Sequence, residues 1–444
     1  MDTFRTSLAY ALPLASLKQS TIMTVLSAAY AAQLDQNDPL KALRDEFHIP
    51  VIDGKQTLYF TGNSLGLMPK GAKTYLDEEL EDWKNWGVEG HFHARRPWMP
   101  YHEFFSESLS KVVGAKPEEV VVMGTLTNNL HLLMVSFFRP EGKRTKILCE
   151  AKAFPSDQYA LASQLRFHGL DPEEHLIEVG PREGEHHIHT EDFKAAIDAH
   201  GEEIALMMIG GVNYYTGQVM AMEELTAYAQ AQGIVVGWDL AHAAGNVELH
   251  LHDWNVDFAA WCHYKYLNSG PGATAGYFVH ERHHGLSDIP RFEGWWGHDK
   301  ETRFQMPEKF VPIPTAEAWQ LSNVPVMAMA PIRASLDIID RAGFPELQKK
   351  SRALTAYLQE VLDYVAQSTG KSLEIITPKD ARGAQISVHV HGYGRPLFDY
   401  LMGEGVITDW REPNVIRMAP VPLYNSFEDI RHFGEILQSY LQNH

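Results

Sequence analysis

Apolar runs that end in a single polar residue organise the middle of this 444-residue chain. One run spans Ile234 to Leu240 and carries Asp239 at its end. Another, Phe258 to Trp261, is followed closely by Lys265 and then by glycines. The interval between Asp239 and Lys265 is long enough for one strand, a connection and the next strand. The pattern therefore predicts a carboxylate and an amine at neighbouring strand ends.

Strand-like and helix-like segments alternate over the first two thirds of the chain. Strands are expected at 120–123, 146–150, 204–209, 234–240 and 258–261, and helices at 128–138 and 223–232. Strands separated by helices predict crossover connections and a mostly parallel, buried sheet.

Beyond Pro331 the pattern changes to long helical stretches, short alternating runs at 385–390 and 415–418, and a last amphipathic helix. This predicts a smaller α+β domain. We therefore expect an α/β protein with an arm and helix at 1–56, a large domain at 57–330 and a small domain at 331–444.

A lysine and an aspartate at adjacent strand ends suit pyridoxal phosphate. Lys265 would form the Schiff base, and Asp239 would keep the pyridine nitrogen protonated so that the ring acts as an electron sink. The sequence thus predicts an enzyme that relies on this cofactor.

The composition excludes several other classes of protein. A formal charge of −19 argues against nucleic-acid binding, which needs clustered Lys and Arg. No apolar run reaches the roughly 18–20 residues that span a bilayer. Only Cys149 and Cys262 occur, which favours a reducing, cytoplasmic setting over a disulfide framework.

The N-terminus has a weak likeness to a signal peptide. Leu8 to Leu17 is mildly apolar and follows Arg5, but Asp2 and Pro13 interrupt the pattern and no cleavage site follows. We expect a flexible arm, or a translation start at Met23.

A loop at 124–129 follows one predicted strand and opens a helix. Backbone N–H groups at a helix start, with the hydroxyls of Thr125 and Thr127, would hold a phosphate. The alternative is a simple helix cap with Thr127 as the capping residue.

Three other positions have both a functional and a structural interpretation. Phe154 could stack on the cofactor and Asp157 could assist at the ring, yet Phe-Pro is also an ordinary loop anchor. His242 could contact the cofactor or be structural. Tyr264 could donate to the phosphate or act as an acid, or simply belong to the core.

Arg417 lies inside an apolar strand-like run. A buried guanidinium binds a carboxylate in bidentate geometry, and an amino-acid substrate would supply one. An internal salt bridge is the alternative.

The chain has 23 histidines, some in local clusters such as 186–189 and 283–284. They lack the helical two-histidine spacing with a partner carboxylate that zinc enzymes use. We expect surface loops and no metal site.

Several segments together resemble the kynureninase family, in order, from about residue 57 to about residue 430. They are 59–66, the loop at 125–131, 154–157, 215–218, 238–243, 264–268, 294–298, 321–323 and 417–422.

The resemblance implies a fold-type-I pyridoxal-phosphate homodimer of the class V aminotransferase group, with a PLP-dependent transferase-like fold. It implies hydrolysis of L-kynurenine to anthranilate and L-alanine, in tryptophan degradation or NAD synthesis. It assigns the Schiff base to Lys265 and the pyridinium partner to Asp239. The other cofactor contacts that it implies are Leu126, Thr127, Phe154, Pro155, Ser156, Asp157, His242, Tyr264, Trp295 and Asn323, of which Trp295 and Asn323 would reach across the dimer interface.

For the substrate, the resemblance implies that Arg417 grips the carboxylate and that His91, Ser322 and Asn323 face the aryl ring. These polar groups favour acceptance of 3-hydroxykynurenine as well. Several relatives carry a hydroxyl residue where this chain has Gly210, so one cofactor contact would be missing.

The expected mechanism uses Lys265 as the base that removes the α-proton and Tyr264 as the acid that protonates the three-carbon product. A cysteine desulfurase is the nearest alternative, but it needs an exposed, mobile cysteine. Cys149 and Cys262 both lie in strand-like runs and are expected to be buried.

Overall fold

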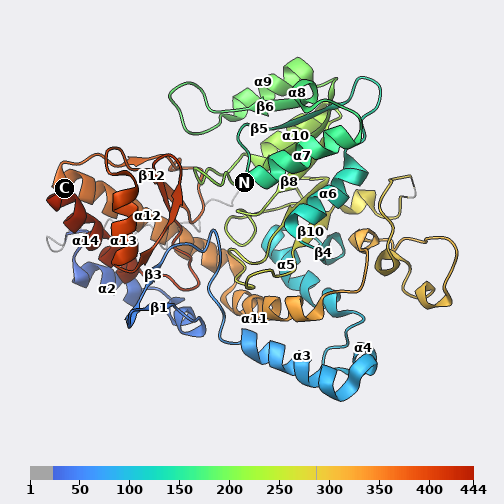
Figure 1. Cartoon of the computed structure of the whole chain (residues 1–444), viewed down its shortest axis with the longest axis horizontal. Coiled ribbons are helices and arrows are strands. Elements are labelled where there is room, and N and C mark those ends of the chain that lie inside the picture. Colours follow the sequence, from blue (N-terminus) through green and yellow to red (C-terminus); the bar gives the residue numbers. More distant parts are fainter. Residues whose placement is uncertain (1–23, 287) are drawn as a thin grey trace, which may run out of the picture. The chain divides into compact units, whose positions relative to one another are not determined.

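The computed structural model describes residues 24–286 and 288–444 (Figure 1). The expected arm and the signal-like segment therefore lie outside the described residues, as does Met23. The chain divides into a larger unit, residues 71–214 and 218–337, and a smaller unit that holds 24–70, 215–217 and 338–444.

A seven-stranded sheet forms the centre of the larger unit, in the order β4-β10-β9-β8-β7-β5-β6. Strand β10 is antiparallel to both of its neighbours, and the others run parallel to one another. The strands are β4 (Val120–Val122), β5 (Lys146–Glu150), β6 (Leu176–Val179), β7 (Ile204–Gly210), β8 (Val235–Asp239), β9 (Phe258–Trp261) and β10 (Gly276–Val279).

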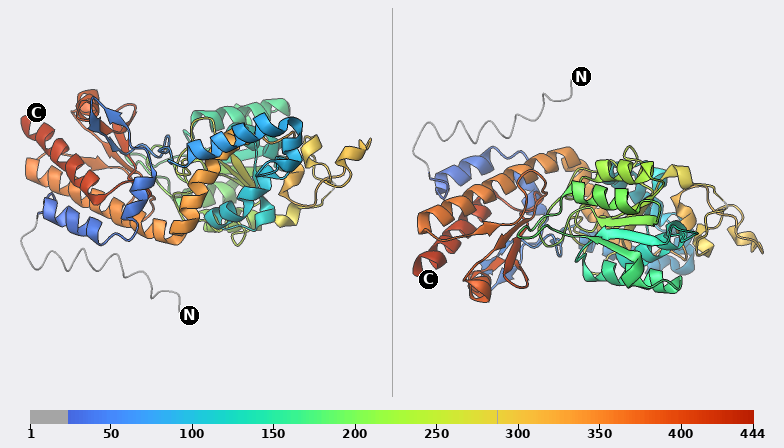
Figure 2. Two further views of the ribbon diagram at one scale, coloured as in Figure 1. Left: turned by 90° about the horizontal axis from the view of Figure 1, so that it is seen from below. Right: turned by 90° about the horizontal axis from the view of Figure 1, so that it is seen from above.

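Helices cover both faces of this sheet (Figure 2). The central strands are therefore buried on both sides, and they consist of nearly continuous apolar runs rather than alternating ones. The helices that begin in this unit are α3 (Ala72–Trp86), α4 (Gly90–His93), α5 (Ser106–Val113), α6 (Leu126–Phe137), α7 (Pro155–Phe167), α8 (Pro172–His175), α9 (Thr190–His200), α10 (Met222–Ala231) and α11 (Val326–Ala342).

The smaller unit has a four-stranded antiparallel sheet in the order β11-β12-β15-β14. Apolar side chains of β12 and β15 share one core with helices α2, α12 and α14. The elements are α2 (Ala28–Gln36), α12 (Phe344–Thr369), α13 (Gly394–Gly403), α14 (Phe427–Asn443), β11 (Glu374–Ile375), β12 (Ile386–His389), β14 (Asp409–Arg411) and β15 (Val415–Met418), with short strands β1 (Val51–Ile52), β2 (Lys55–Gln56), β3 (Leu58–Tyr59) and β13 (Val406–Ile407).

Short 3-10 helices complete the described elements. They are Lys41–Glu46, Gly87–Glu89, Tyr101–Phe105, Pro117–Glu119, Glu281–His283, Trp295–Gly297, Arg303–Gln305 and Ala316–Trp319. Among the described helices, none combines the length and apolar character needed to cross a membrane.

The observed units differ from the predicted domain boundaries at the N-terminal end. Residues 57–70 belong to the smaller unit, because β3 pairs in parallel with β13, and Leu58 of this strand and Phe60 just after it pack in the core of that unit. The helix α2 joins the same core through Tyr30. A two-residue strand gives no periodic signal, so this pairing was not visible in the sequence.

Candidate active site

The polar strand ends lie at one edge of the sheet in the larger unit. Strands β7, β8 and β9 are parallel, so their carboxyl ends meet at that edge, where ligands bind in open α/β sheets. Asp239 ends β8 and is buried, and its Oδ1 accepts the N–H of Ala241 at 2.6 Å. The carboxylate is thus fixed by the backbone of the turn that follows its strand.

A second carboxyl group, that of Asp157, reaches the same place from the first turn of α7. Burial, together with the charge of Asp239 and a hydrogen bond to it, raises the pKa of Asp157 well above its ordinary value. Asp157 therefore keeps its proton beside the charge of Asp239. Its buried Oδ1 receives no donor from the described residues.

Glu150 ends the adjacent strand β5 and was not among the predicted site residues. Its two carboxyl oxygens each accept the N–H of Gly210 at 3.2 Å. Burial raises the pKa of Glu150 to about 7, and the nearby charge of Asp239 adds to this effect. The sequence could have indicated Glu150 as a site residue, because Glu150 ends an apolar run just as Asp239 does.

Gly210 is explained by the same contact. A Cβ at this position would lie 2.9 Å from Oε1 of Glu150, so a side chain here would force that carboxyl group to move. In this chain the space beside Gly210 is filled by Glu150.

Lys265 follows β9 and lies beside His242, with Nζ 3.0 Å from the imidazole Nε2. His242 comes from the turn after Asp239 and is buried. The positive charge of Lys265 acts on Asp157 and partly opposes the increase in its pKa. The sequence prediction that Asp239, His242 and Lys265 come together is matched by this arrangement.

Tyr264 precedes the lysine and hydrogen-bonds to Cys262. Burial, with the neighbouring Cys262 and Asp239, raises the pKa of the Tyr264 phenol above its ordinary value. The hydroxyl is therefore protonated at neutral pH and is able to donate. Cys262 and Cys149 are both free and buried.

The loop before α6 has the geometry of an anion site. Gly124 has φ +60°, and a Cβ there would lie 2.6 Å from Oδ1 of Asn129, so glycine is required. Thr125 caps the helix without a side-chain hydrogen bond, and Leu126 and Thr127 lie in the first turn. Thr127 is thus not the capping residue, and the N–H groups of this turn face the helix start.

Phe154 is an aromatic side chain that this site leaves exposed. It is 44% exposed, and its ring contacts that of Tyr214 edge-to-face at 5.3 Å between centroids. Pro155 and Ser156 follow it as the first residues of α7. An exposed ring beside buried carboxyl groups is able to stack on a planar ligand.

These residues fit pyridoxal phosphate. Asp239 would pair with a protonated ring nitrogen, and the nearby Asp157 has a buried Oδ1 that receives no donor from the described residues. Lys265 supplies the amine that would hold the cofactor, and the start of α6 supplies N–H groups for a phosphate.

Arg417 lies in the smaller unit, on β15, and is buried. Its Nη2 contacts Oδ2 of Asp409 and lies 3.4 Å from Oγ of Ser64, so the internal salt bridge is present. Burial alone would raise the pKa of Asp409, but Arg417 and the bond from Ser64 hold it below its ordinary value.

The remaining predicted residues do not join the Lys265 cluster through any contact among the described residues. Trp295 is 41% exposed and donates Nε1–H to the carbonyl of Arg303 at 3.0 Å. Ser322 and Asn323 are exposed, and the His91 ring lies against Trp98. Their functional roles stay predictions.

Comparison with solved structures shows which known proteins share this fold. The apo cysteine desulfurase of Thermococcus onnurineus NA1 matches with a TM-score of 0.71 at 18% identity, covering 87% of this chain and 95% of that one. A C-DES mutant with glycine covalently linked to its PLP cofactor matches with a TM-score of 0.71 at 16% identity, over 86% of this chain and 96% of that one. The chain therefore shares its fold with these enzymes, one of which carries a PLP cofactor, and the strand-end groups suit that cofactor.

Sequence comparison is more specific. The kynureninase of Christiangramia forsetii is 57% identical over 92% of this chain and 97% of its own length. That of Myxococcus xanthus is 54% identical, over 93% of this chain and 97% of its own. Residues 347–437 match the family described as the kynureninase C-terminal domain. The chain belongs to the kynureninase family, and it is a PLP-dependent hydrolase that acts on carbon–carbon bonds.

The Glu150 carboxyl group gives a pH-dependent prediction. The unfolded chain loses this proton near pH 4.5, whereas the folded protein keeps it to about pH 7, so its burial lowers stability as the pH rises across that interval. Each pKa unit corresponds to about 1.4 kcal/mol. Glu150→Gln removes the charge and keeps an acceptor for Gly210, so the melting temperature of the variant apoprotein should rise relative to wild type between pH 5 and pH 8.

Glu178→Gln is the matched control, because Glu178 lies on the neighbouring strand β6 and is exposed. Its melting temperature should follow that of wild type at every pH. Parallel pH curves for Glu150→Gln and wild type would contradict the assignment.

Proposed function

We infer that the substrate is L-kynurenine, which the enzyme hydrolyses at the Cβ–Cγ bond to anthranilate and L-alanine, and that 3-hydroxy-L-kynurenine is accepted too. The observation that carries this inference is identity of 57% with a kynureninase over 92% of the chain. The strand-end cluster of Asp157, Asp239 and Lys265 supports it independently.

The protein's own groups divide the chemistry between them. When bound, pyridoxal phosphate supplies an electron sink for negative charge at the substrate α-carbon. Asp239 would hold a proton at the pyridine nitrogen, and the protonated Asp157 would stabilise that carboxylate by donating to it. The two buried carboxyl groups thus have different roles, because burial and the charge of Asp239 raise the pKa of Asp157.

Lys265 would hold the cofactor and, once released by the substrate amine, carry the α-proton. Its Nζ lies 3.0 Å from Nε2 of His242, so the imidazole can orient the amine and share its proton. Tyr264, protonated at neutral pH, would donate a proton to the three-carbon product.

Arg417 would bind the substrate carboxylate. A guanidinium has five N–H donors, and the contacts with Asp409 and Ser64 both use Nη2. An incoming carboxylate would either replace Asp409 at the guanidinium or bind beside Asp409. His91, Ser322 and Asn323 would face the aryl ring.

A cysteine desulfurase is the alternative that the fold neighbours raise. Such a neighbour is only 18% identical, and that likeness speaks for the fold alone. The two cysteines, Cys149 and Cys262, are buried, and burial raises the pKa of each thiol. Neither has the exposed, thiolate-forming setting that a nucleophilic cysteine needs.

We also propose a cytoplasmic homodimer, acting in tryptophan degradation or NAD synthesis, with Trp295 and Asn323 completing the partner's cofactor site. The exposed positions of these two residues, away from the Lys265 cluster, support a role toward another chain. Buried, unpaired cysteines fit a reducing compartment.

Lys265→Ala tests the central assignment. The variant should form no anthranilate from kynurenine, measured by fluorescence, and borohydride should no longer fix the cofactor to the chain. Lys300→Ala, which removes a surface lysine on the same unit, should keep both properties. Full turnover by Lys265→Ala would refute the role.

Tyr264→Phe separates acid catalysis from folding. The variant should lose about 10²–10⁴-fold in kcat, as expected for a general acid, with a much smaller change in melting temperature. Tyr266→Phe is the matched control at a buried neighbouring tyrosine. An unchanged rate of alanine formation by Tyr264→Phe would show that another group donates the proton.

Subunit complementation tests the shared site. Lys265→Ala and Asn323→Ala homodimers should each be inactive, and random mixing should restore about one quarter of wild-type activity, because half of the dimers would be mixed and each would have one intact site. A monomer of 50.2 kDa in sedimentation equilibrium, or no recovery on mixing, would contradict the proposal.

A further inference from the structure

Three groups of histidine and carboxylate side chains in the larger unit have ligand atoms close enough to share one ion: Glu119, His252 and His280; His102, Glu103 and Glu317; and Glu185, His187 and His189. The directions of the lone pairs and the existing bonds distinguish these groups. A metal ion must lie near the plane of each imidazole that binds it, because the nitrogen lone pair lies in the ring plane.

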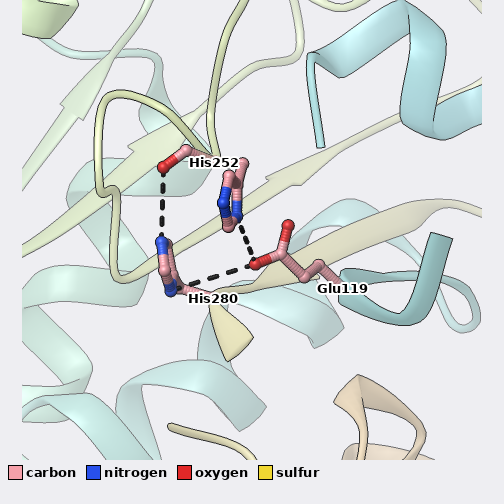
Figure 3. Close-up of side chains that lie close together, drawn as sticks. All are labelled: Glu119, His252 and His280. Carbon is pink, nitrogen blue, oxygen red and sulfur yellow. Dashed lines mark hydrogen bonds and ion pairs between the residues drawn. The ribbon is translucent and has the colours of Figure 1, made fainter. Parts of the chain in front are cut away.

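The Glu119 group is a closed hydrogen-bond network (Figure 3). The rings of His252 and His280 are stacked at 14° with centroids 4.9 Å apart, so nearly parallel planes cannot direct two lone pairs at one ion. Nδ1 of His280 already accepts the N–H of Arg282. Glu119 is bonded to His252 and to two backbone N–H groups.

The His102 group is occupied by a cation of the protein itself. Nζ of Lys300 lies 2.9 Å from carboxylate oxygens of both Glu103 and Glu317. The group also offers only one imidazole. A divalent ion would have to displace this ammonium.

The Glu185 group has the geometry that the other two lack. His189, the residue before α9, has extended backbone angles, and His187 lies two positions before it at a bend of the chain. Their rings are tilted by 54° with centroids 4.7 Å apart, and both Nε2 atoms approach Oε2 of Glu185, that of His187 at 3.9 Å. Three ligand atoms thus converge on one point.

The backbone between the two histidines is held in place. Ile188 is buried, its N–H donates to Oε1 of Gln218 at 2.9 Å, and its carbonyl accepts from Nε2 of Gln218 at 2.7 Å. Arg182 and Asp192 form a two-bond ion pair that ties the start of this loop to α9. The ligands are therefore positioned before any ion binds.

We propose that Glu185, His187 and His189 form a binding site for a divalent transition-metal ion, with zinc as the expected occupant. Two imidazoles and one carboxylate suit zinc, at bond lengths of about 2.0–2.2 Å, and solvent would fill the fourth position. The ion would bind at the two Nε2 atoms that face Glu185, and each neutral imidazole would carry its proton on Nδ1. The site is separate from the Lys265 cluster and does not depend on the catalytic assignment.

Zinc titration of the EDTA-treated holoenzyme, in competition with a chromophoric indicator, tests the proposal. Wild type should bind one tight equivalent that His187→Asn/His189→Asn lacks, while Glu185→Gln should bind at least about tenfold more weakly, as even outer partners of a metal site cost that much. Binding should weaken as the solution is made acidic, because protons compete with the metal ion for its ligand atoms.

His93→Asn is the matched control. His93 is an exposed histidine with one carboxylate partner, Glu89, at 3.7 Å, so this variant should bind zinc as wild type does. All variants should keep kynurenine turnover and far-UV circular dichroism, which separates loss of the site from loss of the fold. The proposal is overturned if wild type binds no tight equivalent, or if the double variant keeps it.

Discussion

Two carboxyl groups in one buried place, those of Asp157 and Asp239, are the constraint on which the site depends. Neither has a cation in ion-pair contact within the described residues, so one of the two acids keeps its proton. Glu150 adds a third acid at the adjacent strand end. Acidic groups that lie together in the protein interior stabilise a positive charge placed beside them. A protonated pyridine ring supplies that charge.

The sheet topology brings these acidic groups together. Parallel strands bring their carboxyl ends to one edge, and β5, β7 and β8 are neighbours there. Glu150 and Asp239 end two of these strands, and Asp157 follows the first of them at the start of α7. Gly210, at the end of the strand between, leaves room for the Glu150 carboxyl group. A glycine at position 210 is thus needed for the packing around these carboxyl groups.

Much of this arrangement could be predicted from the sequence. The runs at 146–150 and 258–261 match β5 and β9, because continuous apolar segments bounded by turns mark buried strands. Strand β6 was missed because it is only half-buried and carries Glu178, and β10 because a glycine-rich stretch precedes it. Lys265 and Asp239 were found through their strand-end positions.

Other features depend on contacts that no local pattern records. The pairing of β3 with β13 joins segments more than 300 residues apart. Because of it, residues 57–70 belong to the smaller unit and not to the predicted large domain. Glu150 had the same strand-end signal as Asp239, but only its burial beside Gly210 shows that it belongs to the site. The histidines at 187 and 189 were expected to be plain surface, and their convergence on Glu185 depends on ring tilt, which spacing alone does not determine.

The bond between Arg417 and Asp409 has a consequence for selectivity. The guanidinium of Arg417 already has an anionic partner within the protein. The free energy gained when a ligand binds there would therefore be the difference between two similar ion pairs. In the proposed role of Arg417, a substrate amide or ester in place of the carboxylate would have to compete with the full charge of Asp409. If Arg417 binds the substrate carboxylate as proposed, Asp409 would exclude amino-acid analogues that lack a full negative charge there.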